Sequence, residues 1–135
     1  MHGVYLTSRR TFLAASSTAA ILNTLPLSAQ TGDLTEYSLV EASELIRRRM
    51  ISPVDLTVAY LDRIEKLQPQ VNAYITVTAD LAIRQAQQLE TEILNGQWRG
   101  PLHGIPIALK DNIDTAGILT TAASSLLQDR IPDTN

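Results

Sequence analysis

Two closely spaced helix-start signals do most to constrain what this chain can fold into. In the first, a serine is followed three residues later by a glutamate, which is the pattern of a capping box (Ser38 and Glu41). In the second, Ser52 directly precedes Pro53, and proline is tolerated at the first position of a helix because that N–H has no partner there. Apolar residues follow each start at helical spacing. The sequence therefore predicts two helices, one over residues 39–50 and one that begins at 53 and ends at Pro69.

A third helix and two strands are predicted further along the chain. Apolar residues recur at helical spacing from Ala79 to Leu94, and Asn95-Gly96 is a typical helix stop. Residues 72–77 alternate β-branched and aromatic side chains, which favours a strand. Residues 106–110 form a short apolar run after glycine and proline, and they are predicted to be a second strand. The order helix, helix, strand, helix, strand indicates an α/β or α+β architecture.

The N-terminal segment has the layout of an export signal. Arg9-Arg10 supply positive charge, an uncharged and mildly apolar run follows, and Ala29 offers a small residue for cleavage. The paired arginines resemble a twin-arginine signal, which the twin-arginine export machinery recognises. The apolar run is too short for a stable membrane span. We therefore expect residues 1–29 to be a twin-arginine signal peptide, residues 30–135 to be the folded part, and the protein to be periplasmic or extracellular.

The charge balance argues against nucleic-acid binding. Residues 30–135 contain nine basic and fourteen acidic side chains, because two of the eleven basic residues are Arg9 and Arg10. The only basic run, residues 47–49, is spread around a predicted helix and is expected to be solvated. Cysteine is absent and only two histidines are present, which disfavours disulfides, thiol catalysis and a histidine-based metal cluster. No metal or organic cofactor is expected.

Lys110 is the strongest candidate for a catalytic side chain. It ends the apolar run of the predicted strand 106–110 and is followed by Asp111. Burial disfavours the charged form of a lysine, so its pKa can fall far enough for the amine to act as a base. The alternative, from position alone, is a lysine whose ammonium reaches solvent or pairs with Asp111 or Asp114.

The residues around Lys110 resemble the lysine block of the amidase signature family. The likeness lies in Gly104-Ile-Pro-Ile-Ala-Leu-Lys-Asp-Asn-Ile-Asp-Thr-Ala-Gly117 and the five residues that follow it, with further likeness in the segments that begin at Ser52 and Val71. Members of that family are serine hydrolases with a Ser–cis-Ser–Lys triad. The resemblance implies that Lys110 is the triad lysine. It also implies an α/β fold with helices around a mixed sheet, of which this chain holds an incomplete N-terminal part.

The same resemblance implies a mechanism whose other parts lie outside these residues. In the family, the neutral lysine accepts a proton from a bridging serine, which in turn deprotonates the serine that attacks an amide carbonyl. The Gly/Ser-rich block that carries those serines does not occur in the 135 residues. We therefore expect part of an amidase that hydrolyses carboxamide C–N bonds of small-molecule substrates. The isolated chain is expected to be inactive.

Two other interpretations stay open. One is a non-catalytic product, either a truncated protein or a partial gene record. The other is an amidotransferase subunit that supplies ammonia for transamidation of aminoacyl-tRNA. The predicted export signal argues against the second, because tRNA chemistry is cytoplasmic.

Several polar residues near Lys110 are expected to have structural roles. Asp111 and Asn112 are suited to orient the loop by hydrogen bonds to the backbone. His103 has no identified partner, which favours a loop role over catalysis. Ser124 and Ser125 are not expected to be the triad serines, and Ala123 stands where family members usually have glycine.

Overall fold

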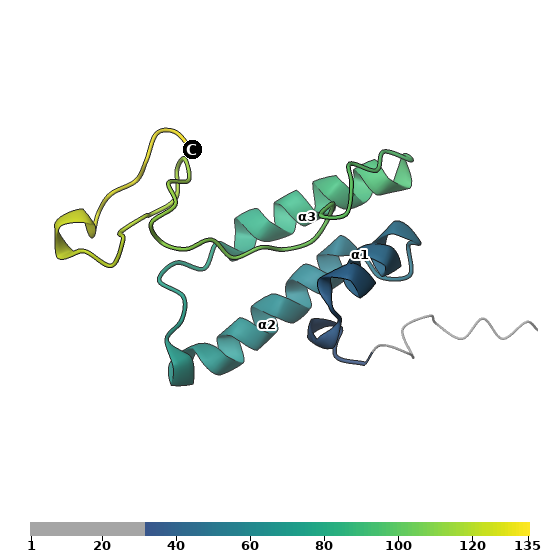
Figure 1. Cartoon of the computed structure of the whole chain (residues 1–135), viewed down its shortest axis with the longest axis horizontal. Helices are drawn as coiled ribbons and strands as arrows, with labels where there is room; N and C mark the ends of the chain where they lie inside the picture. The colour runs from purple at the N-terminus through teal and green to yellow at the C-terminus, as the bar shows by residue number, and fades with distance from the viewer. Residues whose placement is uncertain (1–31) are drawn as a thin grey trace, which may run out of the picture. The chain divides into compact units, whose positions relative to one another are not determined.

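The computed structural model describes residues 32–135, whose regular structure is helical (Figure 1). The α-helices are α1 (Leu39–Arg47), α2 (Pro53–Val71) and α3 (Ala79–Leu94), and the short 3₁₀ helices are η2 (Leu34–Glu36) and η3 (Ser125–Leu127). Residues 1–31 lie outside the described part. The signal peptide expected over residues 1–29 therefore stays a prediction.

Helix α1 begins with the predicted capping box and ends three residues earlier than predicted. Ser38 Oγ accepts from the N–H of Glu41 at 3.3 Å, while the Glu41 carboxylate accepts from the Ser38 N–H at 2.9 Å. The helix closes because Arg49 adopts a left-handed conformation, with φ of 59°. This conformation turns the chain back, so that Met50 N–H donates to Leu45 O at 2.8 Å and satisfies a carbonyl of the last turn of α1.

Helix α2 confirms the predicted start, but Pro69 does not end it. Ser52 Oγ accepts from the N–H of Val54 at 2.9 Å and caps the helix directly before Pro53. Pro69 lies in the last turn of α2, where its missing N–H removes only one helical hydrogen bond. Helical structure therefore continues to Val71. Asn72, with φ of 46°, then ends the helix and donates its N–H to Gln68 O at 2.8 Å.

Side chains from the three helices meet in one small apolar core. Ile46 of α1 and Leu56 of α2 are each 1% exposed, and Ile93 of α3 packs with them. Helix α2 also packs against α3 and η2. Partly buried residues surround the core: Leu34, Tyr37, Ile51, Tyr60, Trp98 and Ile105. The core therefore lies where α1, the start of α2 and the end of α3 meet, and it anchors the chain that follows α3.

The predicted strand over residues 72–77 does not form in the described part of the chain. A strand requires a neighbouring strand to take up its backbone hydrogen bonds, and here a side chain takes up some of them instead. Gln68 Oε1 accepts from Ala73 N–H at 3.1 Å and from Tyr74 N–H at 3.0 Å, and its Nε2 donates to Tyr74 O at 2.6 Å. Residues 72–77 are therefore an irregular connection between α2 and α3.

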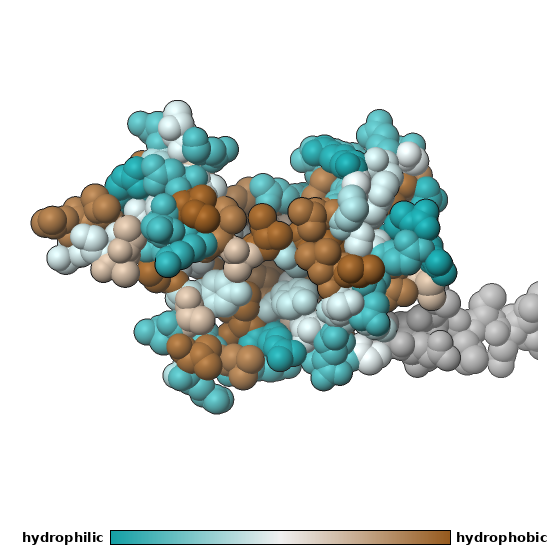
Figure 2. Space-filling view, viewed as in Figure 1, coloured by the Kyte–Doolittle hydropathy of each residue, from teal (hydrophilic) through white to brown (hydrophobic). Residues whose placement is uncertain are grey.

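The second predicted strand, residues 106–110, is likewise irregular. No strand occurs anywhere in residues 32–135, so the predicted α/β class is not confirmed by this part of the chain. Residues 107–110 are exposed, and the Ile107 side chain remains 70% accessible. Figure 2 shows apolar side chains reaching the surface on the face in view. A strand prediction from apolar residues fails here because no partner segment lies beside them.

The chain after α3 turns back along that helix. Ile105 packs against the core, which includes Ile93 at the end of α3. Residues 117–119 line an open hollow of about 390 Å³ with the first residues of α3. Figure 1 shows the same course, with the green segment returning beside α3. This return path places Lys110 between the two ends of α3.

Candidate active site

Lys110 lies at the start of a tight turn and is exposed. The N–H of Ile113 donates to Lys110 O at 2.9 Å, which closes the turn. Within residues 32–135 the amine makes no ion pair. The burial that a neutral catalytic lysine requires is therefore not provided by the described residues, and the expectation of a lysine emerging from a buried strand is wrong for this part of the chain. The reason is the missing sheet neighbours of residues 106–110.

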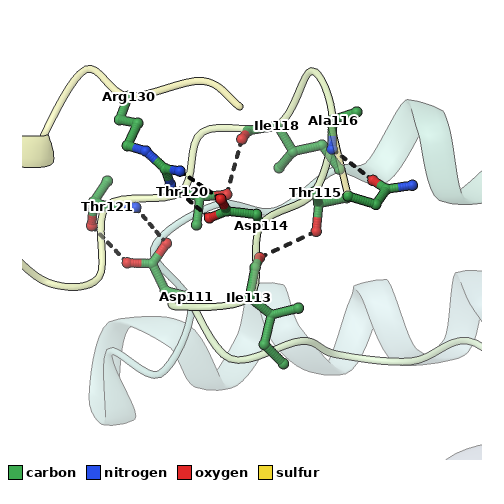
Figure 3. Close-up of polar contacts among 10 residues, drawn as sticks. Asp111, Ile113, Asp114, Thr115, Ala116, Ile118, Thr120, Thr121 and Arg130 are labelled. Atoms are coloured by element: carbon green, nitrogen blue, oxygen red, sulfur yellow. Dashed lines mark hydrogen bonds and ion pairs between the residues drawn. The ribbon is translucent and has the colours of Figure 1, made fainter. Parts of the chain in front are cut away.

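Asp111, the next residue, accepts hydrogen bonds from the backbone of residues 121–123. Its carboxylate accepts from Thr121 N–H at 2.9 Å and from Thr121 Oγ1 at 2.6 Å (Figure 3). It also accepts from Ala123 N–H at 3.1 Å. Its backbone carbonyl accepts from Ala122 N–H at 2.9 Å. Three successive amides thus converge on one residue. This agrees with the predicted loop-orienting role of Asp111. The bonds from Thr121 hold the pKa of the Asp111 carboxyl below its usual value, because they favour the ionised form.

Asp114 is engaged by a residue further along the chain. Its two carboxylate oxygens accept from Arg130 Nη1 at 2.6 Å and Nη2 at 2.5 Å (Figure 3). This pairing lowers the pKa of Asp114. Backbone bonds reinforce the arrangement, since Thr120 N–H donates to Arg130 O at 3.0 Å. Both carboxylates suspected as partners of Lys110, those of Asp111 and Asp114, are therefore occupied elsewhere.

His103 is a buried structural residue. Its side chain is fully buried, its Nδ1 accepts from Arg99 N–H at 3.0 Å, and its ring stacks on Trp98 with centroids 5.3 Å apart. Its Nε2 lies 3.4 Å from a Glu92 carboxylate oxygen, and Glu92 is itself held by the Arg99 guanidinium. These contacts tie the loop after α3 to that helix, which agrees with the predicted loop role.

Among the described residues, no hydrogen bond joins Ser124 or Ser125 to Lys110. Ser124 Oγ accepts from Leu126 N–H at 3.3 Å and caps η3. Ala122 and Ala123, with φ of 50° and 52°, are in the left-handed conformation that usually requires glycine. Ala123, which stands where family members usually have glycine, thus lies in a strained turn. The bonds to Asp111 help to hold this turn in place.

No group of three or more potential metal-ligating side chains occurs in residues 32–135. In the same part of the chain, no helix combines the length and apolar character needed to cross a bilayer.

Comparison with known proteins identifies the family. A model of the family described as Amidase matches residues 55–135, which is more than half of the chain. The chain belongs to the amidase family. This matched region contains most of α2, all of α3, Lys110 and the loop held by Asp111, so the resemblance noted in the lysine segment is confirmed at the level of the family.

Three curated relatives of the chain share one description. The chain is 42% identical over 100 residues to a glutamyl-tRNA(Gln) amidotransferase subunit from Carboxydothermus hydrogenoformans, covering 74% of this chain and 21% of the relative. It is 42% identical over 103 residues to the protein of that description from Dehalococcoides mccartyi, covering 76% and 21%. A third, from Moorella thermoacetica, is 42% identical over 92 residues, covering 68% and 19%. The chain thus spans about a fifth of the length of these amidase-family relatives.

These relatives contradict the predicted location and change which functional interpretation is favoured. The expected periplasmic or extracellular location is contradicted, because the relatives are described as tRNA amidotransferase subunits and tRNA chemistry is cytoplasmic. The export machinery is likewise not supported as a partner. Among the functional interpretations, the relatives favour the amidotransferase subunit, which the predicted export signal had argued against, over the stand-alone amidase.

Sequence reasoning missed two residues that shape the Lys110 region and its surroundings. Arg130 pairs with Asp114 from sixteen residues away, and no spacing rule connects exposed loop residues at that distance. Arg49, expected to be solvated with its two neighbours, donates Nη2 to Ile93 O at 2.8 Å and so bonds an end carbonyl of α3. A run of arginines does not predict the left-handed conformation of Arg49.

Proposed function

We propose that this chain is the N-terminal part of a tRNA amidotransferase subunit in which Lys110 is the proton acceptor of a Ser–cis-Ser–Lys triad. The observation that carries this proposal is the 42% identity to proteins described as glutamyl-tRNA(Gln) amidotransferase subunits, together with the lysine block around Lys110. The proposed activity is release of ammonia from a carboxamide donor, with transfer of the nitrogen to glutamyl-tRNA(Gln). Other subunits are its proposed protein partners.

Lys110 has a defined chemical task in this proposal. Its neutral amine takes a proton from a bridging serine, which allows that serine to deprotonate the nucleophile that attacks the amide carbonyl. The engagement of Asp111 by Thr121 and of Asp114 by Arg130 supports this role, because a carboxylate paired with the lysine would favour the protonated, inactive form. The serines, the oxyanion donors and the burial of Lys110 are proposed to come from residues outside this chain.

The same residues are proposed to complete the α/β fold. The apolar side chains of residues 75, 77, 107 and 109 are largely exposed, and their pairing with additional strands would bury them within a mixed sheet. A structure of the complete enzyme tests this proposal, which is wrong if residues 72–77 and 106–110 remain irregular there. The division of the chain into a signal peptide (residues 1–29) and a folded part (residues 30–135) also stays a proposal. N-terminal sequencing of the purified protein tests it.

Substitution of Lys110 is the direct test of the catalytic proposal. In the complete enzyme, Lys110→Ala is expected to reduce ammonia release from glutamine by at least about a thousandfold, because the serine hydroxyl is a poor nucleophile without its base. Lys66→Ala is a matched control, since Lys66 is the only other lysine and lies exposed on α2. It is expected to remain within twofold of the wild type. Near-normal turnover by the Lys110→Ala enzyme would show that the assigned role is wrong.

A stand-alone amidase is the second candidate, and the family match supports it at the coarser level. The two candidates differ in the fate of the nitrogen. Amide transfer to glutamyl-tRNA(Gln) in the presence of the other subunits is the result expected for an amidotransferase. Hydrolysis of simple carboxamides, with no transfer to tRNA under any condition, would favour the stand-alone amidase.

A further inference from the structure

Asp111 is linked to residues 121–123 by its side chain and its own carbonyl, which together bind three successive amides. Thr121 N–H and Ala123 N–H donate to the carboxylate at 2.9 and 3.1 Å, and Ala122 N–H donates to the carbonyl at 2.9 Å. The Thr121 hydroxyl adds a fourth bond at 2.6 Å. Such an arrangement fixes both the backbone and the side chain of Asp111. It therefore also fixes the direction in which the chain leaves Lys110.

Residues 121–123 are held in a conformation that they would not adopt freely. Ala122 and Ala123 have φ of 50° and 52°, and residues other than glycine disfavour this left-handed region. Both alanines are exposed, so packing does not hold them there. Thr121, in contrast, is buried and gives the carboxylate two of its bonds. Within the turn, Ser124 N–H donates to Thr121 O at 2.9 Å and Ala123 N–H to Thr121 Oγ1 at 3.2 Å. The bonds to Asp111 join this turn to the Lys110 turn.

We propose that Asp111 is a positioning residue for Lys110. By binding the turn of residues 121–123, Asp111 holds the backbone on the C-terminal side of Lys110 in one orientation. The same bonds keep its own carboxylate from pairing with the amine. Asp111 does not touch the substrate in this scheme and exchanges no proton. The inference rests on the proposed catalytic role of Lys110.

Kinetics of the complete enzyme test the inference. Asp111→Ala removes the carboxylate acceptor of Thr121 and Ala123, and is expected to lower kcat for ammonia release from glutamine at least tenfold while KM stays within about threefold. Asp114→Asn is the matched control, since it weakens the neighbouring bond to Arg130 without touching residues 121–123, and it is expected to remain within twofold. A kcat within twofold of the wild type for Asp111→Ala, measured per folded enzyme, would overturn the inference.

A second substitution distinguishes positioning from other roles. If Asp111 acts by holding a left-handed turn, glycine at residue 123 reduces the need for it, because glycine adopts that conformation without strain. The Asp111→Ala, Ala123→Gly enzyme is therefore expected to recover at least threefold in kcat over Asp111→Ala. An unchanged kcat in the double variant would mean that Asp111 acts in another way, and the inference would be wrong. If Asp111→Ala fails to fold, Asp111→Asn replaces it, since it keeps one oxygen for Thr121 N–H.

Two further readouts separate this inference from the proposed function. Hydrogen exchange at the amides of Thr121 and Ala123 is expected to accelerate in Asp111→Ala and not in Asp114→Asn, and unchanged exchange in Asp111→Ala would overturn the inference whatever the activity. In the kinetic assay, a Lys110→Ala enzyme with wild-type turnover would refute the proposed function. An inactive Lys110→Ala enzyme beside a wild-type-like Asp111→Ala enzyme would refute the positioning role alone.

Discussion

Gly104 lies directly against Pro53, and there is no room for a side chain between them. A Cβ added to Gly104 would be 2.8 Å from Pro53 Cγ and 3.1 Å from Pro53 Cβ. Pro53 is the buried first residue of α2, and its ring cannot rotate away. This contact brings the segment that leads to Lys110 against the start of α2, and it depends on the absence of a side chain at residue 104.

Gly104→Ala is therefore expected to destabilise the fold. Gly104 also has φ of 82°, so alanine would add backbone strain to the clash, at a combined cost of about 2–4 kcal/mol in the free energy of unfolding. Gly96→Ala is a matched control, because Gly96 has φ of 80° and nothing within 4 Å of an added Cβ. Urea unfolding followed by circular dichroism measures both, and equal losses in the two variants would contradict the role of the Pro53 contact.

Leu56→Ala is expected to remove a central part of the core. Leu56 is 1% exposed and packs with residues of α1 and α3, so its truncation leaves a cavity and costs about 2–5 kcal/mol of unfolding free energy. The control is Leu126→Ala, at a leucine that is 92% exposed, which should change the stability by less than about 0.5 kcal/mol. The midpoint of chemical denaturation reports the difference. Comparable effects of the two substitutions would show that the core is not where the structure places it.

Acid is expected to destabilise the fold between about pH 5 and pH 2. Hydrogen bonds from Arg47 and Arg48 lower the pKa of Glu44 from 4.5 to about 2. A carboxyl whose pKa is lower in the folded state stabilises the fold above its unfolded pKa, and this contribution is lost as the pH falls through the folded value. The pKa values of Asp111 and Asp114 are lowered in the same direction.

Thermal unfolding as a function of pH checks this expectation. The melting temperature should fall below pH 5, and Glu44→Gln should make the decline shallower. High salt should weaken the Glu44 contribution, because its arginine partners are largely exposed. A melting temperature that stays constant from pH 5 to pH 2.5 would contradict the assigned ion pairs.

The helices were predictable because their determinants are local. The capping box of Ser38 and Glu41, the serine–proline start at Ser52 and the stop at Asn95-Gly96 all act within a few residues, and these helix ends are confirmed. Boundaries were less accurate. Pro69 did not end α2. The end of α1 depends on the left-handed conformation of Arg49, which no side-chain pattern predicts.

The predictions that failed concern groups whose state depends on distant parts of a molecule. Residues 72–77 and 106–110 have strand-like composition, but composition cannot supply the neighbouring strands that a sheet requires. The buried environment expected for Lys110 fails for the same reason. The predicted location depended on the N-terminal residues alone, and it is contradicted by relatives that are described as tRNA amidotransferase subunits.

The helices, the amidase-like lysine segment and the candidate base could be found from residue type and from spacing along the chain. The groups that surround the candidate base became known from the folded arrangement alone. Asp111 meets Thr121 across ten residues and Asp114 meets Arg130 across sixteen. The physical reason is that such pairs form only after the chain has turned back on itself, and turns of irregular backbone carry no periodic signal in the sequence.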